Sequence, residues 1–229
     1  MISVLFLSVF VFLIVALIVL AGAAFLFSNS SLNELWEEES WIEPVVYALL
    51  ACLAALLLSF VNIRVLDAPV PVSLNVTGVL IPVSVSLLLV ALRRIKLFPA
   101  IFSVMVVSVF GFFIAGVGPG GIRADFPFWL VPSGVAALCG YYFSSRKDPL
   151  EMASISYVAG SMGMLLGGDV AHVLPYAASG SNAIVLGAGG LSDFVFLSGI
   201  VSIAMLWSGW MVYAALRRRV LNGTFDANA

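Results

Sequence analysis

The amino-acid sequence predicts an all-α fold, a polytopic bundle of about seven transmembrane helices. Composition is the first reason: 62% of the 229 residues are apolar and 10% are charged, whereas an ordinary soluble domain is about a quarter charged. The pattern is the second reason, because charges gather at the ends of apolar runs of about 20 residues, the length that crosses a bilayer core. The runs are too continuous for the alternating strands of a membrane barrel, so each is expected to be a helix.

The first apolar run, Met1–Phe27, is expected to be a retained first span. No basic residue precedes it, and a cleaved signal peptide usually has a positive start and a shorter apolar stretch. Cleavage of this run would leave six spans and the same topology for the rest. The other spans are expected at about Pro44–Ile63, Thr77–Leu92, Leu97–Val117, Phe128–Phe143, Leu150–Gly168 and Leu191–Leu216.

Polar segments separate these spans. An acidic segment at 28–43 follows the first run, Arg64–Val76 is expected to be a short loop, and Ala171–Gly190 is expected to be a loop rich in glycine, alanine and serine. Residues 1–219 therefore form a single transmembrane domain in this prediction, and residues 220–229 form a short polar cytoplasmic tail.

Basic residues predict the orientation of the bundle. Seven spans place eight of the ten lysines and arginines on one face, and basic residues mark the cytoplasmic side. The N-terminus is therefore expected outside and the C-terminus inside, in a multi-pass protein of the cell membrane. The eight residues are Arg93, Arg94, Lys96, Arg146, Lys147, Arg217, Arg218 and Arg219.

Other classes of partner and cofactor find little support in the composition. The net charge of −2 includes no basic tract for nucleic acid. Cys52 and Cys139 lie inside apolar runs and fit small core residues, and the single histidine leaves little room for metal chemistry. We expect the lipid bilayer as the main partner, no cofactor and no metal. The sequence does not indicate an oligomeric state.

Two carboxylates are the strongest candidates for chemistry, because charges within a membrane domain are costly. Asp169 ends the sixth predicted span and Asp193 begins the seventh, so both belong at the same end of neighbouring helices. A plain structural role is also open, since Asp193 is well placed to cap a helix N-terminus. His172 follows Asp169 by three residues and fits an interfacial loop residue better than a ligand or proton relay.

Small and polar residues surround the two aspartates. Glycines on both sides would let backbones approach closely. Asn62 and Asn75 fit hydrogen-bonding residues at helix ends better than substrate ligands. The supporting set is Gly167, Gly168, His172, Gly189, Gly190, Ser192, Asn75 and Asn62.

Three functions remain open. Two carboxylates held close together share a proton, and such a dyad can activate water, so the first hypothesis is an intramembrane aspartyl hydrolase that uses Asp169 and Asp193 on a membrane-embedded peptide. The second is a transporter or channel in which the same carboxylates bind a proton or a small cation. The cytoplasmic halves of the spans are expected to carry almost no polar residues, which weakens this hypothesis. The third is a non-catalytic membrane subunit whose aspartates hold a loop.

Five motifs resemble a known family, the prokaryotic multi-pass membrane proteins grouped as the sixteen-fourteen "domain of unknown function" family. The longest, Gly187–Ile200, is similar to the family's Gly-Gly-Ala-Gly-x-x-Asp-Gly-Ile-Phe-Leu-x-Gly-Ile, although Phe194 replaces a glycine. The resemblance covers about Ala51–Met205 and implies a shared fold, with Asp169 and Asp193 at motif positions, but no activity. The other four motifs are Ser59–Ile63, Asn75–Pro82 (Thr77 in place of a glycine), Gly116–Pro132 and Ile155–Asp169 (Gly168 in place of an alanine).

Overall fold

The computed structural model describes residues 50, 53–67, 70–118, 121–125, 127–128, 130–144, 148–179 and 183–226. The predicted first span, the acidic segment after it, most of the second span, and Arg146 and Lys147 lie outside the described residues. The described part is mostly helical, which confirms the expected helical character.

Five helices correspond to the last five predicted spans. A π-helical turn, Val76–Leu80, leads directly into α3, and α6 continues into a second π-helical turn, Leu165–Asp169. The last helix runs to Asp226, ten residues past its expected end at Leu216. The bounds are α3 Ile81–Ala91, α4 Leu97–Ile114, α5 Leu130–Phe143, α6 Pro149–Met164 and α8 Phe194–Asp226.

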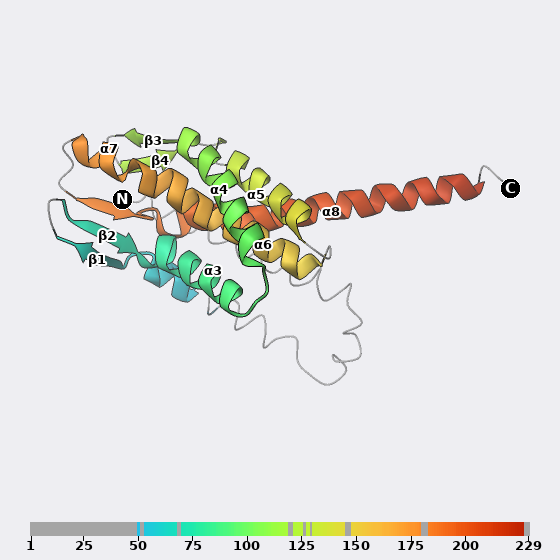
Figure 1. Cartoon of the computed structure of the whole chain (residues 1–229), viewed down its shortest axis with the longest axis horizontal. Helices are drawn as coiled ribbons and strands as arrows, with labels where there is room; N and C mark the ends of the chain where they lie inside the picture. Colours follow the sequence, from blue (N-terminus) through green and yellow to red (C-terminus); the bar gives the residue numbers. More distant parts are fainter. Residues whose placement is uncertain are drawn as a thin grey trace.

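Helix α6 lies at the centre of the bundle and packs against α3, α4, α5 and α8 (Figure 1). Small residues bring these helices close together: a Cβ at Gly160 would lie 2.7 Å from the carbonyl oxygen of Ser198, and a Cβ at Gly163 would lie 2.6 Å from Val107. The Ser202 hydroxyl donates to the carbonyl oxygen of Ser156, 2.9 Å away, and ties α8 to α6. Close approach through small residues and serine bonds is the packing that helices use in lipid.

The short strands and the short helix α7 (Val173–Ala178) lie together at one end of the bundle (Figure 1). Strand β2 (Val72–Asn75) pairs antiparallel with β1 (Asn62–Leu66) and parallel with β5 (Ile184–Leu186). Strands β3 (Ala115–Gly118) and β4 (Gly121–Ala124) form a separate hairpin.

The expectation of plain loops at Arg64–Val76 and Ala171–Gly190 is therefore wrong. These strands contain only three to five residues each, too few for a period-two pattern to distinguish them from loop sequence. Asn62 and Ile63 also belong to β1 rather than to the end of a span. The sheet is important for the site because it joins β1 to two strands that precede helices. Strand β2 leads into the π-helical turn before α3, and β5 leads into the loop before α8.

Two helices among the described residues are long and apolar enough to cross a membrane. They are Leu97–Ile114, which is α4, and Phe194–Tyr213, the first part of α8. The segments Val76–Ala91 and Leu130–Phe143 are shorter apolar helices.

Candidate functional site

Asp169 lies at the end of the π-helical turn that follows α6. Its side chain is buried, with 2% of its surface exposed, and its Oδ2 accepts a hydrogen bond from the backbone N–H of Gly187 at 3.1 Å. Glycines shape this turn: a Cβ at Gly167 would overlap the carbonyl oxygen of Ser108 on α4, and a Cβ at Gly168 would lie 2.7 Å from the ring of Phe194. The glycines before Asp169 thus allow the end of α6 to sit between α4 and α8.

Asp193 precedes the first residue of α8 and has the extended backbone of a helix N-cap, with φ −70° and ψ 139°. Its Oδ1 accepts a hydrogen bond from the N–H of Val195 at 2.9 Å, which satisfies one of the unpaired donors in the first turn. Its Oδ2 accepts from the N–H of Gly189 at 3.3 Å. Asp193 therefore caps its own helix and also holds the loop before it.

The two carboxyl groups influence each other's ionisation. Both lie beyond the ends of the apolar helices, Asp169 after α6 and Asp193 before α8. Burial raises the pKa of Asp169 well above its usual range, and the nearby negative charge of Asp193 raises it further. Burial also raises the pKa of Asp193 to about 6, against the lowering effect of the hydrogen bonds from Val195 and Gly189. A negative charge on one carboxyl therefore disfavours ionisation of the other, and the two groups do not titrate independently.

The loop held by both aspartates, Gly187–Ser192, depends on two glycines with left-handed backbones. Gly187 has φ +71° and Gly190 has φ +57°, a region that residues with a side chain rarely adopt. Gly187 lies directly against Gly78, in the π-helical turn that leads into α3. Gly190 lies against the side chain of Ser59. We call Gly187–Ser192 the glycine loop.

Asn75 organises the other side of this junction. It is almost fully buried, at 1% exposure, and its Oδ1 accepts from the N–H of Gly78 at 2.8 Å, which caps the π-helical turn. Its Nδ2 donates to the carbonyl oxygen of Ser59 at 2.8 Å and to Oδ1 of Asn62 at 2.9 Å. The N–H of Leu191 donates to Ser59 Oγ at 3.3 Å, so Ser59 links the asparagines to the glycine loop.

His172 and Ser192 occupy the edges of the site. The Nδ1 of His172 lies 2.8 Å from the carbonyl oxygen of Gly168, so this nitrogen carries the proton, and the ring lies 5.2 Å from that of Phe112. These contacts hold His172 against the backbone of the π-helical turn. The Oγ of Ser192 is buried and has no hydrogen-bond partner within the described part of the chain. No group of three metal-binding side chains occurs among the residues that were described.

The structure thus joins most of the predicted site residues in one junction, and it adds several that the sequence analysis missed. Ser59, Thr77, Gly78 and Gly187 were not predicted; Thr77 Oγ1 donates to the carbonyl oxygen of Ala55 at 2.8 Å. The sequence feature that could have indicated these residues is the pair of glycine-containing stretches Asn75–Gly78 and Gly187–Gly190. Each of these stretches lies at the start of a predicted helix.

The interior of the bundle also contains polar residues that the hydropathy pattern does not reveal. The expectation that the helix halves far from the aspartates carry almost no polar residues is wrong, because serines there are small enough to escape a hydropathy count. Ser202 and Ser156 bond to backbone carbonyls, which satisfies their hydroxyls inside the bundle. Four of the buried serines lie in the helix halves far from the aspartates: Ser86, Ser103, Ser154 and Ser156.

Together the fold and the junction define a class of protein: a helical bundle of small, tightly packed residues with two coupled aspartates and a glycine loop at one end. The family model "Protein of unknown function (DUF1614)" matches residues 50–205. The chain therefore belongs to this family, as its motifs suggested, and the matched region contains both aspartates, both asparagines and the glycine loop. No curated protein and no solved structure matches the chain.

Proposed function

We propose that the chain is a multi-pass integral membrane protein with a proton-binding aspartate pair that gates one end of the bundle, as in a proton- or cation-coupled transporter or channel. The observation that carries the proposal is that Asp169 and Asp193, both buried, accept hydrogen bonds from the same short loop, at Gly187 and Gly189.

The surface of α4 supports the membrane part of the proposal. Its buried positions are small, including Ala100, Ser103 and Gly111, while Phe98 and Phe113 are 79% and 78% exposed. A soluble protein would place these large apolar side chains inside. In lipid the arrangement is favourable, because the surrounding hydrocarbon accepts the large side chains while the small ones allow close helix packing.

The gating part follows from the charge on the pair. With one proton shared, the carboxyls keep their bonds to the glycine loop and only one buried charge needs stabilisation. Removal of this remaining proton leaves two negative charges in a buried site. The free-energy cost of burying both charges falls if the loop opens to water or a cation enters. Among the described side chains, His172 is a titratable group directly after the π-helical turn, where its Nδ1 lies 2.8 Å from the carbonyl oxygen of Gly168.

A cysteine probe tests the gate. Ser192→Cys is nearly isosteric and replaces a buried hydroxyl that makes no bond in the described structure, while Ser179→Cys provides an exposed reference. Both are made in a background without Cys52 and Cys139, and labelling of the thiol introduced at position 192 is normalised to that at position 179, which removes the effect of pH on thiol reactivity. We expect labelling at position 192 to rise between about pH 5 and pH 8, and to stay low when Asp193→Asn is added. Labelling that is independent of pH would contradict the gate.

The intramembrane hydrolase is the second candidate, and the coupled, buried carboxyl pair favours it because a shared proton is what a dyad needs. It ranks behind transport because hydrolysis needs water on the pair, whereas three of the four carboxyl oxygens already accept backbone N–H bonds. Proteoliposomes separate the candidates. Proton or cation flux abolished by Asp169→Asn supports transport, and cleavage of a membrane-embedded peptide abolished by the same variant supports hydrolysis. A non-catalytic subunit would show neither.

The membrane assignment has its own test. Resistance of the chain to alkaline carbonate extraction from membranes is expected, and release into the supernatant would contradict it.

A further inference from the structure

The helix that begins as α6 continues without a break past Asp169. A 3₁₀ turn, Val170–His172, follows the π-helical turn, and α7 begins at the next residue. Three exposed apolar side chains occur at intervals of four residues along this continuation, so they lie on the same side of it. They are Leu166, Val170 and Leu174, and Leu174 is 80% exposed.

The opposite side of α7 packs against the protein. Val173 and Tyr176 contact the buried cluster that includes Leu186 of β5. Residues 170–179 include no lysine, arginine or carboxylate, whereas the outer side of a helix in water usually carries charged residues. The segment thus has one side that suits the protein interior and another that suits an apolar environment outside it.

The exposed side of this segment adjoins the exposed apolar face of α4. Helix α4 packs against the π-helical turn, and β3, which follows α4 directly, contacts the 3₁₀ turn. The ring of His172 lies 5.2 Å from that of Phe112, and Phe112 and Phe113 are both exposed. A single exposed leucine is common on protein surfaces, but Leu174 extends this larger apolar surface. The lipid that we propose for α4 therefore also reaches α7.

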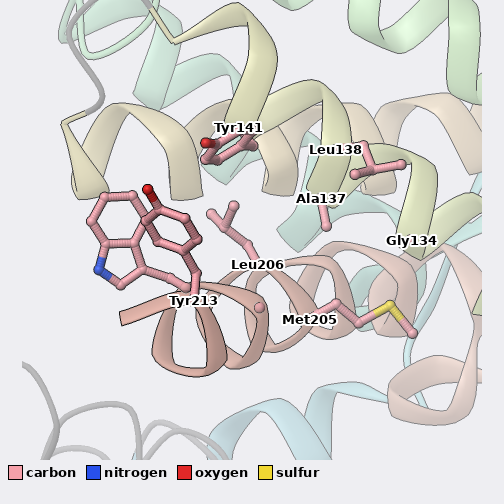
Figure 2. Close-up of a pocket in the computed structure, with 9 residues that line it drawn as sticks. Gly134, Ala137, Leu138, Tyr141, Met205, Leu206 and Tyr213 are labelled. Atoms are coloured by element: carbon pink, nitrogen blue, oxygen red, sulfur yellow. The ribbon is translucent and has the colours of Figure 1, made fainter. Parts of the chain in front are cut away.

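Aromatic residues mark the opposite edge of the bundle. Tyr141 and Tyr213 lie together at one end of the apolar groove between α5 and α8 (Figure 2), and tyrosine prefers the level of the lipid headgroups. The apolar part of α8, from Phe194 to Tyr213, has 20 residues, about 30 Å of helix, which matches the thickness of the hydrocarbon core. The core therefore ends near Phe194, whose ring would lie 2.7 Å from a Cβ at Gly168.

The position of Leu174 relative to this edge fits the interfacial layer of a bilayer. Leu174 follows Gly168 by six residues, about 9 Å of helix. Amphipathic segments at a membrane surface bury their apolar side about 5–10 Å into the boundary between headgroups and acyl chains. Leu174 thus lies just beyond the end of the hydrocarbon core, where its side chain can reach the acyl chains.

We propose that residues 170–178 form an interfacial anchor, with Val170 and Leu174 inserted among the acyl chains where the bilayer meets water beside the aspartate pair. The proposal rests on the membrane assignment above, but not on the aspartate gate. It places Asp169 and Asp193 at the edge of the hydrocarbon core and the glycine loop next to water.

Spin labels on single cysteines test the anchor in proteoliposomes of the full chain without Cys52 and Cys139. Oxygen concentrates among acyl chains, a nickel chelate stays in water, and a label packed inside the protein collides with neither. Leu174→Cys is the test, Met105→Cys on the exposed face of α4 is the lipid reference, and Asp67→Cys, at a side chain that is 82% exposed, is the water reference. The ratio of oxygen to nickel collision rates should be about tenfold higher at position 174 than at position 67, the factor that a difference of 1.4 kcal/mol in partitioning represents.

Three other results are informative. Equal ratios at positions 174 and 67, with a high ratio at position 105, would overturn the anchor and leave the membrane assignment intact. Rare collisions with both reagents at position 174 would also overturn the anchor, because another part of the protein would then cover Leu174. A low ratio at position 105 would refute the membrane assignment and the anchor with it.

Discussion

The effect of Asp193→Asn on the stability of the chain should change sign between low and high pH. Asparagine is as good an N-cap as aspartate, so its oxygen can keep the bond to the N–H of Val195. It cannot accept a second bond from Gly189 through its amide nitrogen, and it never becomes charged. The substitution therefore removes one hydrogen bond at every pH and one buried charge at high pH.

The magnitudes come from these two terms. Loss of the Gly189 bond, which is 3.3 Å long, costs about 1 kcal/mol. Raising the pKa of Asp193 from 3.8 to about 6 by burial corresponds to about 3 kcal/mol, at 1.36 kcal/mol for each pH unit. A carboxyl with a raised folded-state pKa favours folding while protonated, and this contribution is lost as the pH rises from about 4 through about 6. The variant should thus be about 1 kcal/mol less stable than the original chain at pH 4 and about 2 kcal/mol more stable at pH 8.

Thermal unfolding in detergent, followed by tryptophan fluorescence, measures the difference. At about 2–4 °C per kcal/mol for a chain of this size, the Tm of the variant should lie about 2–4 °C below that of the original chain at pH 4 and about 4–8 °C above it at pH 8. The control is Asp148→Asn, because Asp148 caps α6 through the N–H of Leu150 but is exposed to solvent. That control should show no such reversal. Parallel Tm curves for Asp193→Asn and the original chain would refute the reasoning.

Three further substitutions test the junction. Gly78→Ala should prevent correct folding or reduce its yield severely, since the new Cβ would overlap the carbonyl oxygen of Gly187, whereas Gly116→Ala meets nothing within 4 Å and should fold normally; size-exclusion profiles in detergent compare the two. Asn75→Ala should lower the free energy of unfolding by about 3 kcal/mol, because it leaves several buried groups unpaired. Asn62→Ala, at an exposed position with one bond to Asn75, should lower it by about 1 kcal/mol or less. Equal losses in Tm for the two variants would contradict this. Ser192→Ala should be neutral or stabilise by up to about 1 kcal/mol, because its hydroxyl lacks a partner in the described structure, and a clear fall in Tm would show that a partner exists.

The helices could be predicted because their signal is long and local. Leu97–Ile114 is a strongly apolar run without a charged residue, with Lys96 before it and glycines soon after it, so both ends are marked in the sequence itself. The start of α8 at Phe194 lies within three residues of the predicted Leu191 for the same reason. Composition and run length suffice for such elements because each helix satisfies its own backbone hydrogen bonds.

The junction could be predicted only in part, because its contacts are long-range. Asn75 and the glycine loop are more than 100 residues apart, and nothing in either segment reveals that Gly78 and Gly187 touch. The parallel pairing of β2 with β5 has the same character. Motif spacing predicted candidate residues for chemistry, whereas the partners of each residue depend on how the strands align.

The choice of aspartate at the start of α8 supports a role beyond capping. Serine or asparagine would cap the helix equally well without a buried charge, and the exposed Asp148 shows that this chain also uses aspartate as a cap where solvent removes that cost. At Asp193 the desolvation is not removed, and Asp169 adds a second carboxyl whose only described bond is to Gly187 of the same loop. A neutral asparagine at position 193 would lose the bond from Gly189 but would avoid the cost of a buried charge. Two titratable groups that bond to one loop can change their charge with pH, which is what the proposed proton-dependent gate requires.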